Sequence, residues 1–290
     1  MHDFTELDRK IDINKPEKYH ISIQLQPDGF SFCILETYLK RYIGTQHYLI
    51  KEQIHFEDYL TNIDKILNTD PLLQPRYNSV SLMHTSKKAI LVPDVLFNKE
   101  EVRIFFDINE QRDELEEIHY NHIPAFNTYN VFAVHHELLN LFRNKYKNTG
   151  IFHQWSSILS IKDLENTFPG SKAYIHFNKH YFDIVIVKDK RLLFCNSFDY
   201  KNENDFVFYV LNTFKKIKLE LSDLEIIVIG DVYDKGKYFE LLGKFVDSYE
   251  IGNVDEEFSY SPSLKNISKP NLYNLYNLYR CASLAENTEV

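Results

Sequence analysis

The segment His136-Glu137-Leu138-Leu139-Asn140 comes closest to a metal-dependent catalytic motif. In the HExxH motif of zinc proteases, two histidines four residues apart share one helix face and bind the ion, while the glutamate acts as the base. Here the second ligand position is Asn140. We therefore interpret the segment as the polar face of an amphipathic helix.

Two further histidine pairs, His135-His136 and His119-x-x-His122, have spacings that could bind a metal ion. Twelve histidines in 290 residues produce such pairs by chance, and no cysteine or carboxylate pattern completes a tetrahedral ligand set. We expect no metal site.

The three cysteines, Cys33, Cys195 and Cys281, form no CxxC pair and are odd in number. This pattern fits neither a disulfide framework nor a zinc ribbon, and it is typical of a protein of the reducing cytoplasm. Cys33 and Cys195 stand inside apolar runs, so we expect small buried side chains rather than activated thiols.

Phosphate-binding loops need glycine, because only glycine lets the backbone approach a phosphate closely. The chain has eight glycines and no G-x-G, which excludes a Walker A loop and a Rossmann fingerprint. We therefore expect no cofactor and assign no catalytic residue. The glycines are Gly29, Gly44, Gly150, Gly170, Gly230, Gly236, Gly243 and Gly252.

The charge balance excludes further classes of partner. Lys+Arg 33 against Asp+Glu 42 gives a net charge of −9, which argues against a nucleic-acid or anionic-membrane binder. No apolar stretch reaches the roughly 18 residues of a transmembrane helix, and the polar start of the chain does not resemble a signal peptide. We expect a cytoplasmic protein.

The clearest elements lie in the second half of the chain. Residues 172–177, 182–188 and 191–198 alternate with turns and predict a three-stranded antiparallel meander. A helix is expected from about Asn204, because apolar residues recur at helical spacing up to Ile217. The continuous apolar run 225–229 predicts a strand buried on both faces, which gives the order βββαβ.

The first half repeats this order. Strands are predicted at 20–26, 30–36 and 41–50, then a helix whose apolar face carries Phe56, Leu60, Ile63 and Leu67, then strands at 79–83 and 89–93. The repeated order indicates an α/β fold built from two duplicated βββαβ domains.

Between and after these units we expect further elements. A helix capped by Asn98 with Glu101 precedes an acidic connector at 107–118, and strand–helix pairs follow at 129–146 and 149–168. The tail at 271–280 repeats Asn-Leu-Tyr and predicts a terminal helix laid against a domain. Its alternatives are a partner-docking helix and a homodimer interface.

The run Tyr174–Phe198 resembles the second phosphate-loop meander of the actin-like ATPases, which belong to the ribonuclease H-like folds. It is similar to that of the pilus-assembly protein PilM and the division protein FtsA. Residues 131–152 resemble the strand–helix re-entry of those proteins. Taken whole, the chain resembles a bacteroidete family, a domain of unknown function, whose fold is actin-like. The resemblance implies a first domain at 1–170 with an insertion at about 98–148, and a second domain at 171–290 with a C-terminal helix.

The resemblance also locates the nucleotide site of the family, where two hairpins with Asp-x-Gly turns hold the phosphates. The matching positions are Gln24 and Gln26 in the first hairpin, and His176 and Asn178 in the second, which Lys179 and His180 follow. The Gly-Gly turn on the adenosine side is reduced to Gly230-Asp231. The first strands of both meanders therefore lack the carboxylate that would hold Mg²⁺ or activate water.

These replacements favour a non-catalytic protein that binds or scaffolds an unidentified protein partner. The alternative is a divergent ATPase that still binds a nucleotide or another phosphate ligand in the interdomain cleft, through Lys179, His180 and the Gly230 turn.

Overall fold

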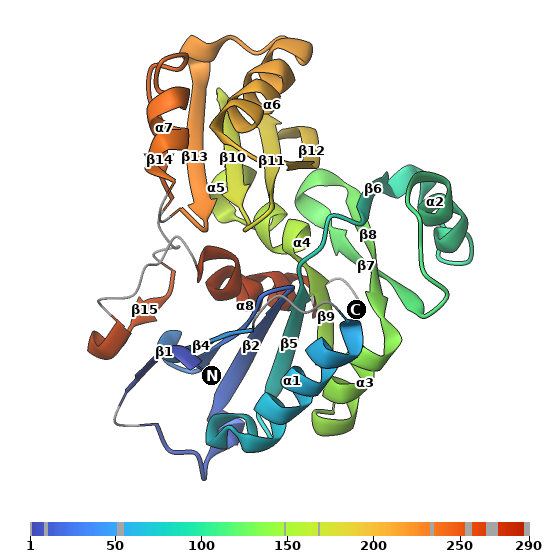
Figure 1. The fold of residues 1–290 in the computed structure, drawn as a ribbon, viewed down its shortest axis with the longest axis vertical. Coiled ribbons are helices and arrows are strands. Elements are labelled where there is room, and N and C mark those ends of the chain that lie inside the picture. Colours follow the sequence, from blue (N-terminus) through green and yellow to red (C-terminus); the bar gives the residue numbers. More distant parts are fainter. Residues whose placement is uncertain are drawn as a thin grey trace.

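The computed structural model describes residues 2–8, 11–50, 55–147, 149–167, 169–232, 235–252, 257–264 and 272–286. The first predicted unit forms β2 (Tyr19–Gln26), β3 (Gly29–Glu36), β4 (Arg41–Leu49), α1 (Phe56–Thr69) and β5 (Ser79–His84). Together with β1 (His2–Leu7), β9 (Thr149–His153) and β15 (Ser259–Tyr260), these strands make one sheet (Figure 1). Its order is β1-β4-β3-β2-β5-β9, and β15 also pairs with β4.

The central strand β2 runs antiparallel to β3 and parallel to β5. Its apolar side chains Ile21, Ile23 and Leu25 are buried in the core that also holds Ile63 and Leu67 of α1. Leu60 packs against this core as well, whereas Phe56, the first residue of the predicted helix face, is exposed.

The second unit forms a separate sheet in the order β12-β11-β10-β13-β14. Its elements are β10 (Ser171–Phe177), β11 (Tyr181–Lys188), β12 (Arg191–Asp199), α6 (Glu203–Lys216), β13 (Leu224–Gly230), α7 (Gly236–Leu242) and β14 (Glu250–Ile251). β10 pairs antiparallel with β11 and parallel with β13, as β2 does with β3 and β5. The two βββαβ units predicted from the sequence are confirmed.

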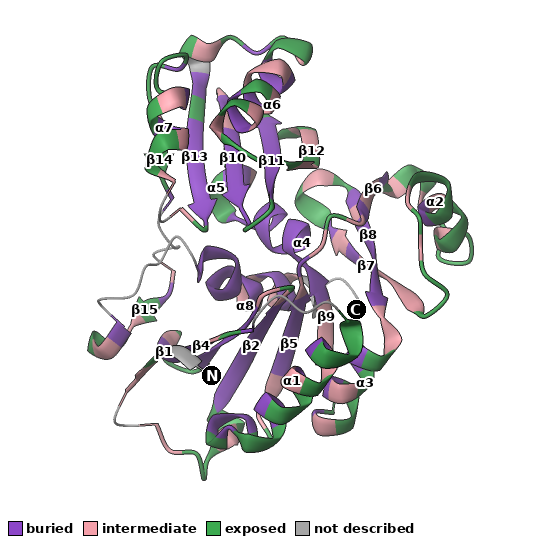
Figure 2. Ribbon diagram, viewed as in Figure 1, coloured by how far each residue is buried: buried purple, intermediate pink, exposed green. Residues whose placement is uncertain are grey.

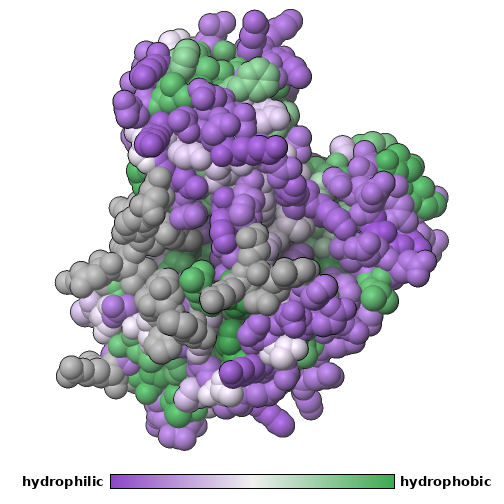
Figure 3. Space-filling model, in the orientation of Figure 1, coloured by the Kyte–Doolittle hydropathy of each residue, from purple (hydrophilic) through white to green (hydrophobic). Residues whose placement is uncertain are grey.

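A third, antiparallel sheet has the order β6-β8-β7 and stands apart from the other two (Figure 1). It contains β6 (Ala89–Pro93), β7 (Glu116–Ile123) and β8 (Thr128–His135), and α2 (Val102–Asn109) packs on it. Hydrophobic side chains gather on the surface over α2 (Figure 3). The predicted cap at Asn98 is wrong. Its side chain accepts the N–H of Glu100 in a local turn, and the helix begins at Val102.

After the third sheet the chain returns through α3 (His136–Lys145) and β9 to α4 (Gln154–Leu159) and α5 (Lys162–Glu165). The C-terminal helix α8 (Tyr273–Glu286) lies between the first two sheets and contacts α4, β2, β5 and β13 (Figure 2). The hydroxyl of Tyr42 donates to the carbonyl of Tyr276, and that of Ser157 donates to the carbonyl of Asn274 at 2.9 Å.

The Leu and Tyr side chains of the terminal stripe are mostly buried inside the chain, including Leu275, Tyr276 and Leu278. The prediction of a helix laid against a domain is therefore confirmed. The stripe is not available as a docking or homodimer surface, because its apolar side chains already pack in the chain's own core. Within the described residues, no helix has the length and apolar character needed to span a membrane.

Candidate functional site

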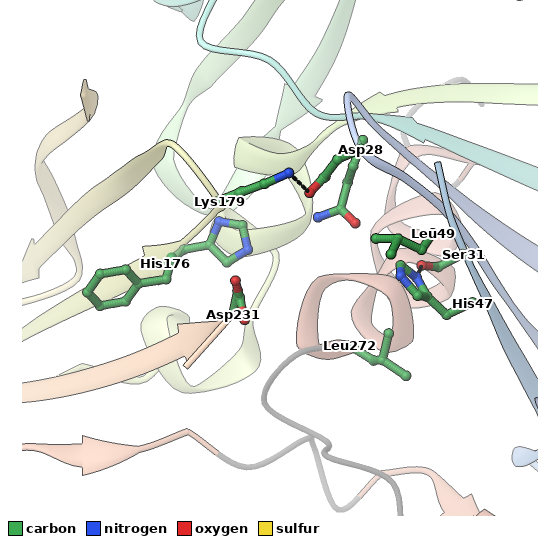
Figure 4. A pocket seen from close by; sticks show the side chains of 11 residues that line it. Asp28, Ser31, His47, Leu49, His176, Lys179, Asp231 and Leu272 are labelled. Atoms are coloured by element: carbon green, nitrogen blue, oxygen red, sulfur yellow. Dashed lines mark hydrogen bonds and ion pairs between the residues drawn. The ribbon is translucent and has the colours of Figure 1, made fainter. Parts of the chain in front are cut away.

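Two hairpin tips face each other between the first and second sheets. Asp28 stands in the β2–β3 turn, and Lys179 stands in the β10–β11 turn at the equivalent place of the second unit. The Nζ atom of Lys179 lies 3.2 Å from Oδ2 of Asp28 (Figure 4). An ion pair thus joins the two hairpins.

One cavity of about 250 Å³ lies beside this ion pair. Ser31 and His47 face it from the first sheet, and their Oγ and Nδ1 atoms are 2.7 Å apart. The whole lining consists of Gln26, Asp28, Ser31, His47, Leu49, His176, Phe177, Lys179, Gly230, Asp231 and Leu272.

A second cavity, of about 340 Å³, shares Gln26, Asp28 and Lys179 with the first, so the ion pair is a common wall. Its lining adds Asn178 and His180 of the second hairpin. It also adds Lys87, whose Nζ lies 2.6 and 2.7 Å from the two carboxylate oxygens of Asp199. A second ion pair therefore connects the two halves of the molecule.

The eight positions that the sequence predicts for the nucleotide site do not share one place: they are divided between the two cavities and the interior of β2. Gln26, His176, Lys179, Gly230 and Asp231 line the first cavity, while Asn178 and His180 line the second. Gln24 lies outside both linings. It is buried in β2, and its Oε1 has no hydrogen-bond partner among the described residues.

The fully buried carboxylate of Asp183 in β11 is the centre of a polar cluster behind the second hairpin. Oδ1 accepts from the Trp155 indole at 2.9 Å and from the Ser197 hydroxyl at 2.5 Å. Oδ2 lies 2.9 Å from Nδ1 of His176 and 3.3 Å from the amide nitrogen of Asn178. His176 and Asn178 are therefore engaged with Asp183.

The other ring nitrogen of His176, Nε2, lies 3.1 Å from the side-chain nitrogen of Asn274 in α8. Donation from Nδ1 to Asp183 and acceptance at Nε2 from Asn274 would satisfy both contacts. The cluster thus connects β10, β11, α4 and α8. It also fixes the orientation of His176, which lines the first cavity.

Sequence reasoning missed four residues of this region: Asp28, Ser31, His47 and Asp183. Asp183 had a readable signal, because it is a single carboxylate in the otherwise apolar run FDIVIV, where an unpaired charge is costly. The other three stand in or near turns and alternate with apolar residues, so their sequence context does not distinguish them from ordinary exposed residues.

Of the cysteines predicted to be buried, Cys33 is buried, whereas Cys195 is only half-buried. Nδ1 of His136 donates a hydrogen bond to the carbonyl of Leu115, 3.1 Å away. Burial raises the pKa of the Cys281 thiol to about 12 and lowers the pKa of His153 to about 3. Across the described ranges, no group of three or more His, Cys, Asp or Glu is placed to hold a metal ion.

Comparison with known proteins identifies relatives of this chain. The profile of DUF3822, a family described as a protein of unknown function, matches residues 8–248. No curated protein sequence matches significantly.

Two solved structures are similar over most of their length. A Bacteroides thetaiotaomicron protein with an actin-like ATPase fold and unknown function is 23% identical, with a TM-score of 0.76 over 83% of this chain and 93% of its own. A chain of the PilM–PilN type IV pilus biogenesis complex is 9% identical, with a TM-score of 0.65 over 91% of this chain and 98% of its own. At these identities the likeness shows the fold, so the expected actin-like ATPase fold is confirmed.

Proposed function

We propose that this chain, which belongs to the DUF3822 family, is a non-catalytic protein of the actin-like fold that binds another protein. The Asp28–Lys179 ion pair is the observation that carries the proposal. In ATPases of this fold the two hairpin tips hold the β- and γ-phosphates between them. Here a carboxylate of one tip already neutralises the cation of the other, so a phosphate group would have to displace it.

The hairpin backbones and the available space support the same proposal. Proline at position 27 has no N–H to offer, and the N–H of Asn178 donates to the carbonyl of Tyr181 at 2.9 Å. The first cavity, at about 250 Å³, is smaller than the roughly 300–1,000 Å³ of ordinary small-molecule sites, and the second, at about 340 Å³, lies at the lower end of that range. Asp183, the carboxylate closest to the second hairpin in sequence, is fully engaged in the buried cluster.

Millimolar Mg·ATP is therefore expected to leave the thermal unfolding midpoint of the protein unchanged. A ligand at about 100 times its Kd would add about 2.7 kcal/mol, which corresponds to a rise of several degrees for a chain of this size. The same scan on the Lys179→Ala variant is expected to show no response either. A rise in the parent that is absent from Lys179→Ala would overturn the proposal and establish the nucleotide-binding alternative.

A partner surface is offered by a groove of about 800 Å³ between the first hairpin, α1 and the third sheet, which we call the acidic groove. Its lining residues are Gln26, Pro27, His55, Phe56, Glu57, Tyr59, His84, Asp113, Glu114, Leu115, Glu116, His135 and Leu138. Four of these described lining residues are carboxylates and none is Lys or Arg, and Lys88, outside the lining, pairs with Asp113 and Glu116. Phe56 and Leu115 provide exposed apolar surface. Burial lowers the pKa of His84 to about 4, so this histidine adds no positive charge at neutral pH.

This combination suits a partner segment with basic residues around an apolar anchor. The similarity to a chain of the PilM–PilN complex is consistent with a function in a protein assembly.

A labelled peptide of alternating arginine and leucine is expected to bind the protein, and its glutamate–leucine counterpart is not. Glu57→Gln/Glu114→Gln, which removes two rim charges, is expected to weaken binding roughly threefold to tenfold, because each exposed charge contributes up to about 1 kcal/mol. The control Glu220→Gln/Glu240→Gln removes two exposed charges from the other half of the molecule. An equal loss in both double variants, measured by fluorescence anisotropy, would show that net charge rather than the acidic groove determines binding.

A further inference from the structure

Helix α2 presents an uncovered apolar stripe on the far side from its sheet. Phe106 is fully buried, and Val102 and Phe105 pack against the same cluster on the third sheet. Ile104 and Ile108, by contrast, are 60% and 76% exposed. They are four residues apart, so they are neighbours on one helix face, in the region where Figure 3 shows hydrophobic side chains at the edge of the molecule.

A charged stripe runs directly beside the apolar one. Arg103 and Asp107 are also four residues apart, and Arg103 Nε lies 3.4 Å from Asp107 Oδ2. At about 100° per residue, this stripe lies on the exposed side of α2 next to Ile104 and Ile108. The exposed face thus consists of one apolar row and one row with a positive and a negative end.

We propose that this face of α2 binds a second copy of the same chain through a two-fold axis perpendicular to the helix. Such an axis packs the two α2 helices antiparallel and makes each copy use the same patch. Ile104 then meets the partner's Ile108, and Arg103 meets the partner's Asp107. The midpoints of the two rows lie one residue apart, about 1.5 Å along the helix, so one axis close to residues 105 and 106 brings both rows together.

Charge complementarity favours a second copy over an unrelated partner. A partner of one charge sign would pair with either Arg103 or Asp107 and would meet the other with like charge. Within one chain Asp107 pairs with Arg103 and Arg112, and a second copy extends these exposed pairs across the axis with opposite charges facing each other. The proposal is independent of the acidic groove and of the function proposed for it.

The size of the patch predicts a weak dimer. A two-turn helix face buries less than the roughly 800 Å² per partner of a standard stable interface. We therefore expect a monomer–dimer equilibrium that is visible at tens of micromolar protein and reversible on dilution.

Sedimentation equilibrium of the full chain, from about 1 to 200 µM, tests the proposal. The parent is expected to approach twice the monomer mass at high concentration. Ile104→Gln/Ile108→Gln is expected to weaken the association at least tenfold, because it removes the apolar row. Because both side chains are largely exposed, circular dichroism and the thermal midpoint are expected to stay at parent values.

The charged row is tested by reversal. Arg103→Asp places carboxylates opposite each other across the axis and is expected to weaken association about tenfold. Arg103→Asp/Asp107→Arg restores opposite charges across the axis and is expected to recover association to within about threefold. Arg112, which also contacts Asp107, keeps the carbonyls of Asp113 and Glu116 as partners in this variant.

Arg191→Asp makes the same change of charge at an exposed residue of β12. Its average mass is expected to rise with concentration as that of the parent does. A parent that stays monomeric throughout the concentration range would overturn the proposal. So would parent-like association of the glutamine double variant, or a reversal variant that stays as weak as Arg103→Asp.

Discussion

Replacing Asp183 with alanine is expected to lower the free energy of unfolding by about 3–5 kcal/mol, the range for removing one partner from a buried charged network. Asp183 is fully buried and accepts from Trp155 and Ser197 while it contacts His176 and Asn178. Alanine would leave these groups without an acceptor in a region that water does not reach. At about 2–4 °C per kcal/mol, the thermal midpoint should fall by roughly 6–20 °C.

The matched control for this variant is Asp199→Ala. Asp199 is a carboxylate on the neighbouring strand, and its ion pair with Lys87 is largely exposed, so its removal should change the free energy of unfolding by less than about 1 kcal/mol. Asp183→Asn, which keeps one acceptor oxygen, is expected to fall between the two. Equal midpoints for Asp183→Ala and Asp199→Ala would show that the buried cluster does not contribute this stability.

The repeated unit could be predicted from the sequence because its signals are local. Apolar runs separated by turn residues, such as the run 182–188 before the Lys188–Lys190 turn, are sufficient to define a meander. The helical spacing from Phe206 to Phe214 placed α6 correctly, and four of its apolar residues are buried against the second sheet. The fold class followed from the order of these elements.

The site could not be predicted in the same way because its contacts are long-range. Asp28 and Lys179 are about as far apart in sequence as the two units of the duplication, and neither has a neighbour that identifies the other as its partner. The position of α8 between the sheets also depends on tertiary packing, since its Leu–Tyr stripe would suit an external surface equally well. Strand β1 was missed because its sequence, HDFTEL, is mostly polar, and because it is itself the edge strand, which among the described residues pairs with β4 alone.

Among the cleft positions predicted from the sequence, Gly230 is the one at which the backbone geometry most directly requires glycine. Its φ of +86° lies in the region that disfavours side chains, and a Cβ there would lie 2.2 Å from the carbonyl oxygen of Phe177 and 3.0 Å from its nitrogen. Gly230→Ala is therefore expected to lower the free energy of unfolding by about 2–5 kcal/mol, which combines the backbone strain with the displacement of a packed strand. Denaturant unfolding followed by tryptophan fluorescence would measure the change.

Gly236→Ala provides the comparison, because Gly236 begins α7 and a Cβ there would have no atom within 4 Å. That substitution should be neutral or should stabilise the protein by up to about 1 kcal/mol, through the lower entropy of the unfolded chain. A large difference between the two variants means that packing against β10 requires glycine at position 230 whether or not a ligand binds. If Gly230→Ala is as stable as Gly236→Ala, packing does not explain this glycine, and close approach of a ligand to the turn becomes the better explanation.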